Sequence, residues 1–321
     1  MKGTGLALMS SAIISQTGIF VRFLTDTYGL AALDLVFWRN ALVCASLLCT
    51  TTFTGRPRLI VAPKNLLFLA AYGLILAVFN GVWTTAVICS GAAVSTVLAY
   101  CSVGYTALLG AWLFDERLNQ LQQLAVCLSL AGCLLVSNAL VPEAWNGNAT
   151  GIVTGILSGL LYAGYSLMGR EAARRGVNAW TTIFHIFTFA ALFQMAAIVL
   201  FGEKIPILTA GPGKLLCLNS HPDSWLWLLL YAVGPTLVGF GLYAKSLNYL
   251  PAAMANIIVT LELVFTGITA YLLFGETFQL LQWAGCMLIV AAILLLNLSI
   301  RKQQKTPPPN AKENCNAYKH P

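Results

Sequence analysis

Three ionisable side chains lie within long apolar stretches of this sequence. Arg39, His185 and Glu262 each interrupt a run of mostly apolar residues that is about twenty residues long, enough to cross a bilayer. A charge at the centre of a membrane helix costs about 2.5 kcal/mol or more, so each of these residues needs a compensating role. Residues of this kind commonly mark substrate sites, proton pathways or buried ion pairs.

Each of the three has a functional and a structural interpretation. Glu262 is the only acidic residue at the centre of an apolar stretch, where it could carry a proton, bind a substrate ammonium group or act as a neutral hydrogen bonder. Arg39 could bind a carboxylate or phosphate, pair with Glu262, or hydrogen-bond backbone carbonyls. His185 can exchange a proton near neutral pH, although a histidine in this position is more often a polar packing residue.

Aromatic and amide residues on the same stretches could shape a pocket. Trp83, Tyr100 and Tyr243 are our candidates for substrate contact, and Trp83 and Tyr243 occupy matching positions of an internal repeat. The alternative for each is a packing or membrane-interface aromatic. The wider set comprises Gln16, Asn80, Tyr105, Tyr162, Tyr165 and Asn256. The nine cysteines show no metal-ligand spacing, so we predict neither a metal site nor a cofactor.

The composition requires a membrane to hold these residues. Hydrophobic residues make up 58% of the 321 residues and charged residues 9%, against about 25% charged in soluble proteins. Ten stretches are long enough to span a bilayer as helices. They lie near 5–24, 31–54, 65–88, 92–113, 121–140, 151–169, 179–201, 225–247, 252–274 and 279–299, with very short turns near Gly91 and Pro251.

The two halves of the chain resemble each other. A set of positions in the first half recurs 160 residues later, which predicts one repeat over 1–146 and a second over 147–300. Each repeat holds five spans, an odd number, so the second enters the bilayer inverted, as in many secondary transporters. Residues 301–321 are predicted to be a disordered tail. The recurring positions in the first half are Ala92, Ala93, Thr106, Leu113, Phe114, Glu116, Leu121, Gln122, Ala131, Leu134 and Leu135.

Charge predicts the orientation. With the N-terminus inside, thirteen lysines and arginines fall in cytoplasmic segments and only Lys204 and Lys214 in outer loops. This positive-inside bias predicts a multi-pass protein of the cytoplasmic (inner) membrane with both termini in the cytoplasm. The basic residues are spread between the spans, so the net charge of +7 does not indicate nucleic-acid binding.

The motifs at the repeated positions resemble a known family. "LFDERL" around Glu116, "LFGETF" around Glu276 and "FWRNAL" around Arg39 are similar to the EamA-type families of the drug/metabolite transporter superfamily. Such families often carry a proline shortly before the glutamate motif, and this chain departs from that pattern with Gly104 and Leu263 near those places. We interpret Glu116 and Glu276 as structural residues at helix ends.

The resemblance implies a function. It indicates a secondary transporter, not an enzyme, that exports small metabolites such as amino acids by alternating access of spans 1–4 and 6–9. Spans 5 and 10 would pack peripherally, at a homodimer contact if one forms. The driving force would be the substrate gradient or protons moving through Glu262 or His185. The alternatives are a nucleotide-sugar or phosphorylated-metabolite transporter, or an intramembrane enzyme or scaffold.

Overall fold

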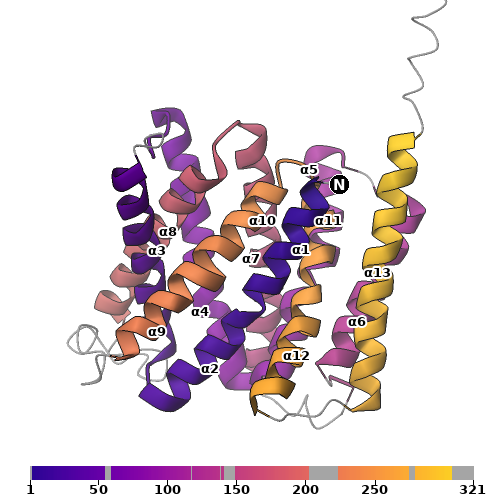
Figure 1. The fold of residues 1–321 in the computed structure, drawn as a ribbon, viewed down its shortest axis with the longest axis horizontal. Helices are drawn as coiled ribbons and strands as arrows, with labels where there is room; N and C mark the ends of the chain where they lie inside the picture. Colours follow the sequence, from indigo (N-terminus) through magenta and orange to yellow (C-terminus); the bar gives the residue numbers. More distant parts are fainter. Residues whose placement is uncertain are drawn as a thin grey trace, which may run out of the picture.

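The computed structural model describes residues 2–54, 59–116, 118–137, 139–140, 149–201, 223–274 and 279–305. Within these ranges the regular elements are all helical and form one bundle (Figure 1). The helices are α1 (Lys2–Ile14), α2 (Gln16–Tyr28), α3 (Ala32–Thr54), α4 (Pro63–Tyr100), α5 (Ser102–Phe114), α6 (Gln120–Val136), α7 (Ala149–Arg174), α8 (Ala179–Phe201), α9 (Asp223–Tyr231), the π-helix η3 (Ala232–Phe240), α10 (Gly241–Ser246), α11 (Ala252–Val259), α12 (Leu261–Phe274) and α13 (Leu280–Lys305).

These helices provide the predicted ten spans. Nine stretches of the described chain are long and apolar enough to cross a membrane, and α6 is a shorter apolar helix. The first repeat contains α1 to α6, and the second contains α7 to α13. The chain is therefore an all-α multi-pass membrane protein of two inverted five-helix repeats, as the sequence predicts.

Spans 3 and 4 meet inside α4, whose helical backbone continues past Gly91, where the sequence predicts a turn. The chain nevertheless reverses direction there, because the residues before and after Gly91 follow α7 in opposite orders. Tyr72, Ile75 and Ser90 contact α7 at Gly169, Gly164 and Gly151, and then Leu98, Tyr105 and Gly110 contact it at Gly155, Gly159 and Leu167. The glycines of α7 allow both spans to approach it closely.

Spans 4 and 9 bend at matching places without a proline. At Cys101, between α4 and α5, ψ is −16°, and at Thr260, between α11 and α12, ψ is −18°. An α-helix has ψ near about −42°, so each bend is a local tightening of the helix. These tightened turns lie a few residues before Gly104 and Leu263, so both helices depart from regular α-helical geometry there without a proline.

The repeated glutamines begin the last helix of each repeat. The Asn119 side chain accepts from the Gln122 amide at 3.0 Å, while Gln122 Oε1 accepts from the Asn119 amide at 3.0 Å. In the second repeat, Gln282 Oε1 accepts from the Gln279 amide at 2.9 Å. Such reciprocal bonds satisfy amide groups that a helix start leaves free, which explains why Gln122 and Gln282 match.

The helices α6 and α13 lie side by side at one edge of the bundle (Figure 1). They cross where Gly132 and Gly285 bring the two backbones together. A methyl group on Gly132 would lie 2.8 Å from the carbonyl oxygen of Gly285 and 2.7 Å from the side chain of Ile289. Only residues without a side chain fit this crossing.

Basic residues gather at one end of the bundle. Lys64 lies at the start of α4, and Arg170, Arg174 and Arg175 lie at or just beyond the end of α7. We call this the basic end. The starts of α1, α8 and α11 lie there too, since the chain crosses the bundle in alternating directions.

Candidate functional site

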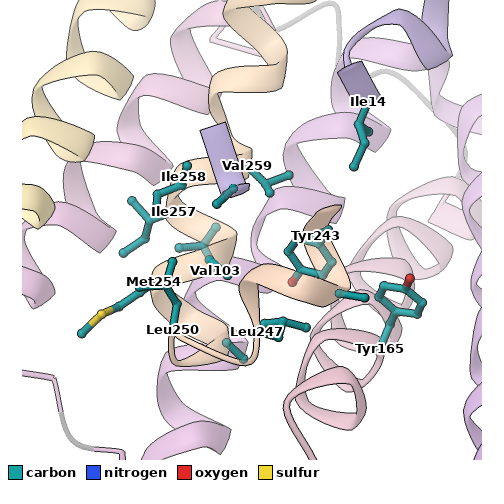
Figure 2. Close-up of a cluster of buried hydrophobic side chains, with 14 of the residues drawn as sticks. Ile14, Val103, Tyr165, Tyr243, Leu247, Leu250, Met254, Ile257, Ile258 and Val259 are labelled. Carbon is teal, nitrogen blue, oxygen red and sulfur yellow. The ribbon is translucent and has the colours of Figure 1, made fainter. Parts of the chain in front are cut away.

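A polar network crosses the centre of the apolar core and joins the two repeats. The Tyr243 hydroxyl on α10 donates to Asn256 Oδ1 on α11 at 2.5 Å and lies 2.8 Å from Ser166 Oγ on α7. Ser166 donates to the same Asn256 oxygen at 3.0 Å, and the Asn256 amide donates to Thr106 on α5 at 3.4 Å. Figure 2 shows Tyr243 and Tyr165 among aliphatic side chains. Since its members are buried, losing one would leave the others without partners.

Tyrosine rings pack around this network. Tyr165 stacks on Tyr162 with ring centroids 6.0 Å apart and on Tyr243 at 6.4 Å, and Tyr72 lies 5.0 Å from Tyr165. The rings come from α4, α7 and α10, so they pack spans 3, 6 and 8 together. Stacked aromatic faces can also bind a cation or a flat substrate.

The structure brings two predicted residues together at the bends of spans 4 and 9. Tyr100 ends α4 and Glu262 lies in the first turn of α12, and the Tyr100 phenol lies beside the Glu262 carboxyl. Both side chains are only partly buried although they lie mid-span, and Tyr162 lies near enough to interact electrostatically with Glu262. The site therefore offers a carboxyl group and two phenols at the centre of the membrane.

Arg39 belongs to a separate polar cluster. Its guanidinium donates to the Tyr231 hydroxyl at 3.1 Å and to Asn40 Oδ1 at 3.2 Å, and lies 5.8 Å from the Tyr231 ring centroid. Asn40 in turn donates to Gln194 Oε1 on α8 at 2.9 Å. The sequence allows Arg39 to pair with Glu262, but its contacts are with the neutral side chains of Tyr231 and Asn40. Through Tyr231, Arg39 joins α3 to α9.

The remaining candidates lie outside the central network. The nitrogen Nδ1 of His185 is 2.8 Å from the Thr181 carbonyl of the same helix, and the ring meets Phe184 edge-on. Trp83 is partly exposed on α4, one turn beyond Asn80, whose amide nitrogen is buried without a hydrogen-bond partner. Neither His185 nor Trp83 has a contact described here that links it to Glu262.

Glu116 ties three spans together at the basic end. Arg170 on α7 donates through Nε to Glu116 at 3.0 Å and through Nη1 to the Leu247 carbonyl at 2.7 Å. These contacts join the end of α5 to α7 and to the turn that follows α10. Glu276, the matching residue of the second repeat, lies outside the described residues.

A cavity of about 760 Å³ opens elsewhere, at the basic end between α3, the start of α4, the α7–α8 turn and η3. Its lining does not include Glu262, Tyr100 or Tyr243, so it is distinct from the central polar residues. Unlike those residues, it lies at the end of the spans.

Several contributors could not be selected from the sequence. Tyr72, Ser166, Gln194 and Tyr231 belong to no repeated motif, and serine and tyrosine are common in membrane helices. Their importance comes only from their partners across helices. In the sequence these residues are distinguished only by being polar within an apolar stretch, and many other residues share that property.

Comparison with known proteins agrees with the architecture. The EamA-like transporter family model matches twice, over residues 1–138 and 149–298. An uncharacterized transporter of Archaeoglobus fulgidus is 27% identical over 294 residues, covering 91% of this chain and 95% of the relative, and an uncharacterized transporter of Helicobacter pylori strain J99 is 26% identical over 313 residues, covering 92% and 94%.

More distant similarities were also found. Over 72 residues, 22% of this chain and 60% of the relative, it is 31% identical to a probable 4-amino-4-deoxy-L-arabinose-phosphoundecaprenol flippase subunit of Pseudomonas fluorescens. A protein of known crystal structure shares the fold with a TM-score of 0.73 at 15% identity, covering 92% of this chain and 98% of that one. With matches across both repeats, this chain belongs to the EamA-like transporter family.

Proposed function

We propose that the protein is a secondary transporter that exports small metabolites bearing an amino group, such as amino acids. The observation that supports this most is the Glu262–Tyr100 pair at the bends of spans 4 and 9, with Tyr162 nearby. A carboxylate beside aromatic faces attracts an ammonium group by charge and by cation–π interaction. Glu262 can bind either this group or a proton, which would couple export to proton entry.

The transport cycle we propose is alternating access around this site. The structure has the basic end tied by Arg170, Glu116 and the Leu247 carbonyl. Close packing supports the same closure, because Gly3 of α1 sits directly against Tyr249 and Leu250. Releasing the Arg170 contacts would free α7 from α5 and from the α10–α11 turn, and so open a path from this end.

The basic end would face the cytoplasm of a cell with an inner membrane, by the positive-inside rule. Both termini would then be cytoplasmic. The pair of α6 and α13 leaves apolar side chains on its outer surface, such as Leu124, Met287 and Leu294. This edge is where we would place a homodimer contact.

The alternative cargo, a nucleotide sugar or phosphorylated metabolite, has less support. Binding a phosphate would require basic side chains near the middle of the spans that can reach the substrate. Arg39 instead donates hydrogen bonds to Tyr231 and Asn40. An enzyme would need an acid–base pair at one depth, and the partner of Glu262 is a phenol.

A counterflow assay tests the proposal. Proteoliposomes loaded with one unlabelled metabolite are exposed to its labelled form, across a panel of amino acids, amines, nucleosides and sugar phosphates. We expect labelled amino compounds to accumulate and sugar phosphates not to. Accumulation of sugar phosphates alone would favour the alternative, and no accumulation of any compound would contradict transport of these classes.

A further inference from the structure

The cavity at the basic end has two chemically different zones. Leu47, Leu237 and Val238 form an apolar wall, while Thr50, Asn178 and Arg175 form a polar rim. Its volume of about 760 Å³ falls within the range of about 300–1,000 Å³ that is typical of ligand sites. A ligand that fills it must be apolar at one end and polar at the other.

The apolar wall reaches into the depth of the membrane. Leu47 lies seven residues before the last residue of α3, and Val238 eight before the last residue of α10. At about 1.5 Å per helical residue, the wall extends about 10–12 Å inward from the helix ends. Val238 is 37% exposed and Ile60, on the rim, is 70% exposed, so the cavity is open to its surroundings.

The polar rim is positively charged. Arg175 and Asn65 both line the cavity, and Lys64 precedes Asn65 at the start of α4. The Arg175 guanidinium rests over the Phe68 ring at 4.1 Å and uses Nε to reach Glu171 at 2.8 Å. Arginine has five N–H donors, so its two terminal nitrogens remain for an anion. The starts of α4 and α8 face the same space and add partial positive charge.

We propose that this cavity holds an anionic phospholipid, with its phosphate at Arg175 and one acyl chain along Leu47, Leu237 and Val238. A cation at the level of the headgroups above an apolar groove suits a lipid, whereas a water-soluble anion would leave the apolar wall uncovered. Glu171 competes for Arg175 with the phosphate. This site is independent of the central residues and does not rest on the identity of the cargo.

Native mass spectrometry of the purified protein tests the proposal. The protein in detergent is mixed with equal amounts of phosphatidylglycerol and phosphatidylcholine, and the retained lipid is counted. We expect preferential retention of phosphatidylglycerol, reduced about tenfold in Arg175→Gln, since a charge-assisted bond contributes about 1.5–3 kcal/mol. Arg175→Lys should retain part of the preference, and Glu171→Gln should increase it.

Two controls make the test specific. Arg174→Gln removes a charge from the same end, but Arg174 lies over Phe114 at 5.0 Å and does not line the cavity, so retention should stay within about twofold. Val238→Trp fills the apolar zone and should reduce retention of both lipids. Each variant is first shown to elute as one species and to melt within a few degrees of the parent.

Thermal protection by inorganic phosphate and by glycerol 3-phosphate separates a lipid from a free phosphate. We expect phosphatidylglycerol to protect and the two soluble phosphates not to. Equal protection by all three, equal retention of the two lipids by the parent protein, or equal effects of Arg174→Gln and Arg175→Gln would each overturn the proposal.

Discussion

Breaking the Arg170–Glu116 ion pair should favour conformations in which the basic end is open. Glu116→Gln keeps the shape of the side chain and removes its charge, so Arg170 loses its ion pair and keeps only neutral acceptors, the new amide oxygen and the Leu247 carbonyl. The side chains of Arg170 and Glu116 are 20% and 17% exposed, so the pair is partly shielded from water. Two charges 4 Å apart attract by about 4 kcal/mol near a protein surface, and desolvation offsets much of this. A net loss of about 1–2 kcal/mol shifts the population of the open form by about five- to thirtyfold.

Double electron–electron resonance can measure this shift. Nitroxide labels on Asn248→Cys, in the turn after α10, and Gln120→Cys, at the start of α6, report the separation across the basic end in a cysteine-free background. Glu116→Gln should add a population at longer distance. Glu171→Gln is the matched control, because the Glu171–Arg175 ion pair joins residues four positions apart at the end of α7 and does not itself link two spans. If Glu116→Gln leaves the distance distribution between the labels unchanged, or if Glu171→Gln changes it in the same way, the Arg170–Glu116 ion pair does not hold the basic end closed.

Three further predictions concern the bundle. Gly132→Ala should lower the melting temperature by several degrees, since overpacking costs about 1–3 kcal/mol. Gly104→Ala is the control, because its added methyl group would meet its nearest neighbour at 3.7 Å and should leave the melting temperature unchanged. Equal melting temperatures of the two variants would contradict the tight crossing of α6 and α13. Tyr243→Phe should cost about 1–3 kcal/mol in unfolding assays by removing the phenol from its buried polar partners, and an unchanged stability would show that the network is not cooperative. Cysteines at Lys64 and Thr27 should react with an impermeant maleimide from opposite sides of the membrane, and labelling from one side would rule out the topology.

Much of the fold follows from physical properties that the sequence displays directly. Apolar runs of about twenty residues predict spans, and the bounds of the second and seventh predicted spans lie within a residue of those of α3 (Ala32–Thr54) and α8 (Ala179–Phe201). The recurring glutamines predicted matching positions, and their backbone contacts at helix starts supply the reason. Hydropathy locates these two helices because each ends close to the end of its apolar run, whereas it does not show that α4 continues through two spans.

Local geometry was harder to predict. A proline inside a helix is expected to kink or break it. At Pro235 the structure has a π-helix, in which the Thr236 hydroxyl donates to the Tyr231 carbonyl at 3.1 Å. Proline removes one backbone donor, and whether the helix kinks or widens depends on its neighbours, here Ser10 donating to the Gly239 carbonyl at 2.9 Å.

The site depends on which helices meet, which residue types do not specify. Glu262 was recognisable because it is an acid in an apolar stretch, but its partner Tyr100 lies 162 positions away. Arg39 could equally have paired with Glu262, and only the packing of α3 against α9 gives it Tyr231 instead. For Trp83 and His185, substrate contact and proton coupling remain predictions.

Counterflow with the Glu262→Gln variant tests the central claim most directly. Glutamine keeps the volume of the side chain and an oxygen that can accept a hydrogen bond, but it cannot be charged. With an amino compound that the parent protein transports, we predict that the variant loses at least about tenfold in flux, since a charge-assisted bond contributes about 1.5–3 kcal/mol, and that its residual flux no longer depends on pH. A variant that folds normally and keeps the flux and pH profile of the parent would contradict a central site built on Glu262.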